Sequence, residues 1–86
     1  MAAANVLTTA ATAANSSDQA ITVDTVFGLK GAEVGAVVYI DEKDDGGLWN
    51  TIGRMENHEN RNSVILSAGT YRFRRPAGPN CGVYSG

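Results

Sequence analysis

From residue 20 onward the chain consists of short runs in which apolar and polar residues alternate, separated by Gly, Asp and Asn. Alternation with a period of two residues puts successive side chains on opposite faces of a β-strand, whereas a helix repeats about every 3.6 residues. Several short strands separated by turn residues are typical of an all-β domain. The pattern predicts a small antiparallel β-sandwich or barrel of the immunoglobulin-like, Greek-key kind, spanning residues 20–86.

Two segments show the alternation most clearly. The segment 20–27, AITVDTVF, predicts a half-buried strand. Its inward face would consist of Ile21, Val23, Thr25 and Phe27. The segment 33–40, EVGAVVYI, is apolar on both faces, which predicts a central strand. DEKDDGG at 41–47 predicts a hairpin turn, because Asp and Gly tolerate the backbone angles of tight turns.

Residues 1–19 have a different composition and contain mainly Ala, Thr, Ser and Asn, with Val6 and Leu7 as the only sizeable apolar residues after Met1. Such a segment buries too little apolar surface to offset the entropy lost on ordering. The composition predicts an N-terminal arm that is flexible alone and ordered by a partner, with Val6 and Leu7 as apolar anchors. On this hypothesis, deletion of residues 2–17 abolishes assembly but leaves the domain folded.

Charged and aromatic residues are most closely interspersed in the segment 66–78, LSAGTYRFRRPAG. Its L-x-x-G-x-Y spacing resembles the tyrosine corner of immunoglobulin-like sandwiches, in which the ring packs in the core and the hydroxyl bonds an upstream backbone group. Alternation puts Tyr71 and Phe73 on one face of a strand, and Arg72 and Arg74 on the other. The residues predicted to support the fold here are Leu66, Gly69, Tyr71 and Phe73.

The arginines of this stretch have two interpretations. Arg72 and Arg74 could form a solvated face paired with acidic side chains across the sheet, where exposed pairs contribute about 0–1 kcal/mol. Alternatively, Arg75 joins them in a basic patch for an acidic partner surface, since a guanidinium binds a carboxylate through two hydrogen bonds. Nucleic acid is not an expected partner, because the formal net charge is −2 and other basic clusters are missing.

Trp49 follows Gly46-Gly47-Leu48 at the exit of the predicted hairpin. We expect it to cap the end of a thin core, because one indole buries a large apolar area. The alternative is an exposed ring that offers a flat surface to a sugar or a protein.

No catalytic, metal or cofactor site is predicted. The run from Asp41 to Gly46 superficially matches a calcium loop, but Lys43 and Ile52 occupy the third and twelfth positions, where an EF-hand needs oxygen ligands. His58 has no second imidazole or cysteine at metal-ligand spacing, and Cys81 has no nearby base in the sequence. The sequence favours a surface histidine, a small and partly buried thiol, and a protein that is not an enzyme.

The chain length and the absence of certain segments limit the oligomeric state and the cellular location that we expect. A domain of 86 residues has a thin core, and a single cysteine excludes an intrachain disulfide, so we expect a homo-oligomer. No apolar run reaches the ~18 residues that span a bilayer, and the first basic residue is Lys30, so neither a membrane segment nor a secretory signal is expected. The sequence indicates synthesis in the cytoplasm.

The layout resembles small virion proteins of tailed bacteriophages, such as capsid decoration or cement proteins and head-fibre base proteins. The resemblance covers most of the chain and is carried by the Ala/Thr/Ser-rich start, DDGGLWNTIG, AGTYRFRRP and CGVYSG. It implies no cofactor and no catalytic residue. It implies assembly in the virion with the major capsid protein or another virion protein, and the candidate assembly contacts are Val6, Leu7, Arg72, Arg74 and Arg75.

Two other functional classes are considered. A carbohydrate- or receptor-binding module would expose the rings of Trp49 and Tyr84. A small enzyme would need the fold to bring His58, Cys81 and a carboxylate together.

Overall fold

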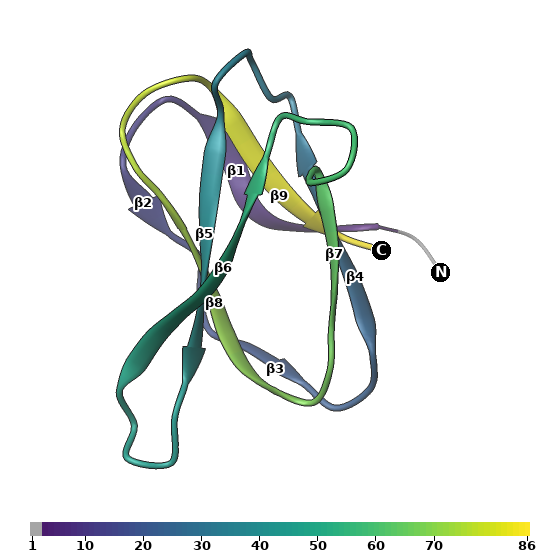
Figure 1. Cartoon of the computed structure of the whole chain (residues 1–86), viewed down its shortest axis with the longest axis vertical. Helices are drawn as coiled ribbons and strands as arrows, with labels where there is room; N and C mark the ends of the chain where they lie inside the picture. Colours follow the sequence, from purple (N-terminus) through teal and green to yellow (C-terminus); the bar gives the residue numbers. More distant parts are fainter. Residues whose placement is uncertain (1–2) are drawn as a thin grey trace.

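The alternating segments form two antiparallel sheets in the computed structural model, which describes residues 3–86 (Figure 1). In order across the first sheet lie β1 (Ala4–Ala10), β9 (Cys81–Ser85), β4 (Thr25–Lys30) and β7 (Ser63–Leu66). In order across the second sheet lie β2 (Ala14–Asn15), β8 (Gly69–Arg75), β5 (Val37–Lys43) and β6 (Trp49–Glu56), and β3 (Gln19–Ile21) also pairs with β8. The predicted all-β sandwich is confirmed.

β5 is the central strand that its two apolar faces predict, because it pairs with β6 on one side and β8 on the other. Val38 and Ile40 are buried in the core, whereas Tyr39 lies on the opposite face. The strand starts later than the predicted segment 33–40, and Val34 is 91% exposed in the turn before it.

The predicted single strand at 20–27 is wrong. β3 ends at Ile21 in the second sheet and β4 begins at Thr25 in the first, so the chain crosses between the sheets at residues 22–24. Val23 is 71% exposed in this crossing, while Phe27 further along is fully buried. An alternating pattern cannot reveal such a crossing, because both strands keep their own period of two.

The core between the sheets is built around two phenylalanines. Phe27 of β4 and Phe73 of β8 are fully buried, with ring centroids 4.8 Å apart and ring planes tilted by 42°. Aromatic pairs with this geometry contribute about 0.5–1.5 kcal/mol beyond their buried area. The other buried hydrophobic residues are Leu7, Ala36, Val38, Ile40, Met55, Leu66, Tyr71, Cys81 and Val83.

The described part of the N-terminal segment belongs to the sandwich, which differs from the predicted separate arm. β1 pairs with β9, and Leu7 lies opposite Val83 and is 7% exposed. Ser16 clamps β8, since its backbone N–H donates to Phe73 O (2.8 Å) and its Oγ accepts from Phe73 N–H (2.9 Å). The domain therefore starts in the segment that was assigned to the arm, while residues 1 and 2 of that arm lie outside the described residues.

Tyr71 has the hydrogen bond expected of a tyrosine corner. Its ring is 5% exposed, and its hydroxyl donates to the carbonyl of Ser67 at 3.0 Å. Gly69 gives the hydroxyl room, because a Cβ at this position would lie 3.1 Å from Tyr71 Oη and 3.0 Å from Glu42 Oε2. Leu66, Tyr71 and Phe73 thus all face the core, as predicted.

We expect Tyr71→Phe to lower the free energy of unfolding by about 1–1.5 kcal/mol, because the Ser67 carbonyl loses its donor. Urea denaturation followed by tryptophan fluorescence measures the change. Tyr39→Phe is the matched control, since the Tyr39 hydroxyl has no hydrogen-bond partner among residues 3–86, and its expected effect is below about 0.5 kcal/mol. Equal losses in the two variants would contradict the corner.

Candidate functional site

The outer face of the second sheet gathers basic and aromatic side chains from three neighbouring strands. We name the following six residues the arginine–aromatic face: Tyr39, Asp41 and Lys43 of β5, Trp49 of β6, and Arg72 and Arg74 of β8. The strand register brings them together in three cross-strand pairs, Tyr39–Arg74, Asp41–Arg72 and Lys43–Trp49. Residues directly opposite each other in an antiparallel pair have side chains in contact distance.

Asp41 is the centre of this face and is only 1% exposed. Its Oδ2 accepts from Nε of Arg72 (2.9 Å) and Nε of Arg74 (3.1 Å), and its Oδ1 accepts from the Thr51 hydroxyl (2.7 Å). Burial alone would raise the pKa of Asp41, but the hydrogen bonds from Arg74, Thr51 and Arg72 outweigh burial and lower this pKa. The carboxylate is therefore charged at neutral pH and holds both guanidiniums in place.

Both guanidiniums stack on aromatic rings. Cζ of Arg72 lies 4.6 Å from the centroid of Trp49, and Cζ of Arg74 lies 4.8 Å from the centroid of Tyr39. Nζ of Lys43 is 5.4 Å from the Trp49 ring. Such cation–π contacts fix the plane of each guanidinium. With its Nε bound to Asp41, Arg72 keeps both Nη groups without partners among residues 3–86, and they can donate to an external acceptor.

The predicted core cap at Trp49 is wrong, because the ring is half-buried on the outer face and is absent from the core. A β-bulge explains the difference. Met55 pairs with Val38 on the inner face, but the register shifts at Ile52, so that Ile40 faces Gly53 and Asp41 faces Thr51. The extra residue reverses the faces of the residues on the hairpin side of the bulge, so Trp49 points outward.

Arg75 does not belong to the arginine–aromatic face, so the alternative interpretation in which it joins Arg72 and Arg74 in a basic patch is wrong. It lies on the inner face of β8 and is 3% exposed. Its Nε donates to Thr12 O (2.7 Å), and its Nη1 donates to Thr8 O (2.7 Å) and Cys81 O (2.8 Å). The guanidinium therefore ties the N-terminal segment to β8 and β9.

The two apolar residues predicted as assembly anchors also pack within the sandwich. Leu7 is in the core, and the partly buried Val6 packs against it. Neither side chain is thus presented as the anchor of a free arm.

The residues considered for catalysis lie in different environments. His58 is exposed in the loop after β6, as predicted for a surface histidine. Cys81 is fully buried on β9, and burial raises the pKa of its thiol although the charge of Arg75 opposes the shift. Among residues 3–86, no three His, Cys, Asp or Glu side chains form a group that could hold a metal ion. The same residues include no helix with the length and apolarity needed to cross a membrane.

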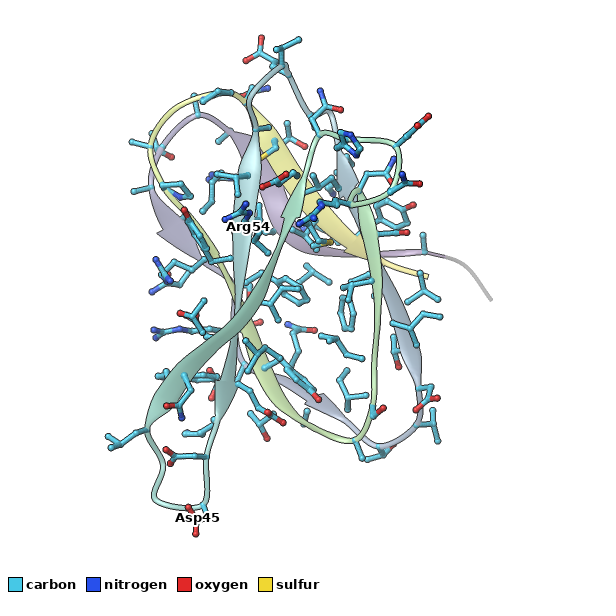
Figure 2. All side chains as sticks on the ribbon, viewed as in Figure 1. Asp45 and Arg54 are labelled. Atoms are coloured by element: carbon cyan, nitrogen blue, oxygen red, sulfur yellow. The ribbon has the colours of Figure 1, made fainter. Side chains whose placement is uncertain are left out.

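The β5–β6 hairpin extends beyond the sandwich, with Asp45 at its tip and Arg54 further along β6 (Figure 2). Asp44 closes the turn, since its Oδ1 accepts from the N–H groups of Gly46 and Leu48 and its Oδ2 accepts from the Asn50 amide, each at 2.9 Å. The hydrogen bond from Asn50, followed by that from Leu48, lowers the pKa of Asp44. Its carboxylate thus acts within an acidic hairpin turn.

Sequence reasoning missed Tyr39 and Asp41 as members of the site. Asp41 was assigned to the turn, whereas β5 continues to Lys43. The sequence did contain a signal for these two residues. Tyr39, Asp41 and Lys43 alternate along one strand and therefore share a face, as Arg72 and Arg74 do on the strand of the segment 66–78.

The comparisons with protein-family models, curated proteins and solved structures found no similar protein. A functional assignment therefore starts from the surface of this chain. The arginine–aromatic face is the surface on which charge, aromatic rings and fixed geometry coincide.

Proposed function

We propose that this protein is a non-enzymatic structural component of a tailed-phage virion, a capsid decoration or cement protein that is made in the host cytoplasm. It would bind a neighbouring virion protein, such as the major capsid protein, through the arginine–aromatic face. The observation that carries the proposal is the pair of guanidinium–aromatic stacks held by the buried carboxylate of Asp41. Arg, Trp and Tyr are the residue types most enriched in the hot spots of protein interfaces.

The side chains of this face are already ordered before binding. Asp41 and the two rings restrict Arg72 and Arg74, which lie on strands rather than on loops. Binding therefore loses less side-chain entropy than it would with free arginines. A rigid surface of this kind suits a permanent place in a symmetric particle.

The charge of the face indicates an acidic partner. Lys43, Arg72 and Arg74 outnumber Asp41, so the face is positive on a chain whose formal net charge is −2. The exposed acidic hairpin tip at Asp45 offers a complementary surface on a second copy, which supports a homo-oligomer. Attachment through this face replaces attachment through an N-terminal arm, because Leu7 belongs to the core.

Sedimentation of a native lysate from the source, with detection of this 9.0 kDa chain across the gradient, tests the proposal. We expect the chain to travel with particles of megadalton size. In a phage that encodes Arg72→Gln, incorporation should fall by about tenfold or more, because a hot-spot contact contributes about 2 kcal/mol or more.

Arg61→Gln is the matched control, since Arg61 is exposed in the loop after β6 and outside the face. It should leave incorporation unchanged. A wild-type chain that stays at the top of the gradient as a free monomer would refute the virion assignment, and equal incorporation of both variants would refute the choice of surface.

A second candidate is a carbohydrate- or receptor-binding module, which the position of Trp49 outside the core favours. Trp49 is the only tryptophan, so its fluorescence reports directly on this surface. Arg72 and Lys43 already contact the ring, and a sugar would have to displace one of them. A saturable change in Trp49 fluorescence on titration with bacterial polysaccharides would favour this candidate over assembly.

A further inference from the structure

β7 is an edge strand of the first sheet, and the backbone groups along one of its sides are unpaired (Figure 1). The ladder between β7 and β4 continues to Leu29, whose N–H donates to Asn62 O (2.9 Å). Because hydrogen-bonded and non-hydrogen-bonded pairs alternate in an antiparallel ladder, the backbone groups of Val64 also point toward β4. Those of Ser63 and Ile65 point to the open side of β7, where no backbone group of residues 3–86 pairs with them.

The other edge strands have features that hinder pairing with a further chain. Bulges, charged residues and very short strands protect sheet edges in this way. β1 has two register irregularities, and β2 and β3 have only two and three residues. β6 has a bulge and carries Arg54 and Glu56. β7 has a regular register, no charged residue and no proline, so among the edges that the structure describes it is the one most open to an added strand.

The side chains beside this edge are apolar and partly exposed to solvent. Val26 of β4 lies opposite Ile65 on the outer face of the first sheet, and the two side chains are 41% and 66% exposed. On the inner face, Val64 is half-buried against the core. A strand added at β7 would cover Ile65 and the exposed part of Val64, and this burial of apolar surface favours the addition.

The charges at the two ends of β4 favour a second copy of this chain as the source of the added strand. Asp24 immediately precedes β4, and Lys30 is the last residue of β4. Neither forms a salt bridge with any of residues 3–86. When two copies pair antiparallel through β7, the Lys30 end of one copy lies on the same side as the Asp24 end of the other, so opposite charges face each other twice.

We propose that two copies of this chain associate through β7, which joins their four-stranded sheets into one continuous sheet. Val64 lies opposite its own equivalent on the two-fold axis, and Ser63 of each copy pairs with Ile65 of the other. Each of these two residues has one N–H and one C=O directed at the partner strand, so the two copies share four backbone hydrogen bonds.

This dimer goes beyond the virion assignment and does not depend on it. Residues opposite each other in an antiparallel pair point to the same face, so the two-fold axis is perpendicular to the joined sheet. Both second sheets then lie on the same side of it, and the two arginine–aromatic faces point in the same direction. If the assembly role holds, each dimer binds its neighbour through two faces, which strengthens attachment through effective concentration.

Sedimentation equilibrium of the full chain tests the dimer. A strand of four residues forms a small interface. Interfaces below about 1,200 Å² are typically weak, so we expect a monomer–dimer equilibrium that becomes evident as the concentration approaches about 1 mM.

Amide hydrogen exchange locates the interface. The N–H groups of Ser63 and Ile65 should gain protection as the concentration rises, because they are hydrogen-bonded only in the dimer. The N–H of Val64 bonds to β4 and should be protected in dilute and concentrated solution alike.

Ile65→Lys adds a charge at an exposed side chain of the edge strand. The two new lysines would lie close to the two-fold axis and repel each other, and the dimer would lose the apolar contact, so its Kd should rise by at least about tenfold. Val34→Lys is the matched control, since Val34 is 91% exposed in the turn before β5 and lies outside β7. It should dimerise as the wild type does, and thermal unfolding of the dilute chains checks that both variants fold.

A chain that remains monomeric at about 1 mM would overturn the proposal. A dimer in which the amides of Ser63 and Ile65 gain no protection would do the same, as would equal weakening of the dimer in the two variants. Dimerisation is measured on the free chain, and incorporation is measured in particles. Failure of one experiment therefore leaves the other result standing.

Discussion

A chain that lacks residues 2–17 is expected to be unfolded. The deletion removes β1 from the edge of the first sheet and Leu7 from the core, where loss of a leucine side chain alone costs about 2–5 kcal/mol. It also removes the Thr8 and Thr12 carbonyls that accept from the buried guanidinium of Arg75, and each unsatisfied buried group costs about 1–3 kcal/mol. These losses together are comparable to the whole stability of a small domain, about 5–15 kcal/mol.

Far-UV circular dichroism and urea denaturation of the truncated chain measure the result. A chain without residues 2 and 3 is the control, because β1 begins at Ala4, and it should unfold at the wild-type midpoint. A truncated chain that retains the wild-type spectrum and midpoint would show that β1 is dispensable. The sequence-based hypothesis of a detachable arm would then be correct.

The fold class could be predicted because β-strands and tight turns leave local marks on a sequence. The two apolar faces of Val37–Ile40 identified the central strand, and the spacing of Leu66, Gly69 and Tyr71 indicated the corner. The place of β1 could not be predicted in the same way. Its backbone groups pair with β9 at the far end of the chain, and backbone pairing imposes little on the side chains of Ala, Asn and Thr.

The candidate site was predicted only in part, for two physical reasons. The bulge at Ile52 reverses the faces of residues 49–51, and Gly53 beside it is a local mark of a bulge that does not by itself give the direction of Trp49. The other reason concerns Arg75, which shares the inward face of Tyr71 and Phe73 by alternation. Its charge suggested exposure, but carbonyl acceptors from the N-terminal segment allow it to be buried.

Asp41→Asn is expected to lower the free energy of unfolding by about 2 kcal/mol. Removing one partner of a fully buried ion pair costs about 3–5 kcal/mol. We expect a smaller loss here, because the side chains of Arg72 and Arg74 are 25% and 39% exposed and keep some hydration. The asparagine keeps the shape of the side chain but leaves the guanidiniums of Arg72 and Arg74 without an anion. Urea denaturation at neutral pH measures the loss.

The pH dependence of the same variant separates charge from packing. The pKa of Asp41 is lowered in the folded state. The contribution of its charge to the free energy of unfolding is therefore complete above the unfolded-state pKa of about 3.9, and it is lost as the pH falls through the lower folded-state pKa. The stability difference between wild type and Asp41→Asn should therefore shrink as the pH falls from about 5 to about 2. Asp45→Asn, at the exposed hairpin tip, should match the wild type at every pH. A difference that persists unchanged at low pH would mean that Asp41 acts through its shape, and the arginines would then be oriented by their aromatic partners alone.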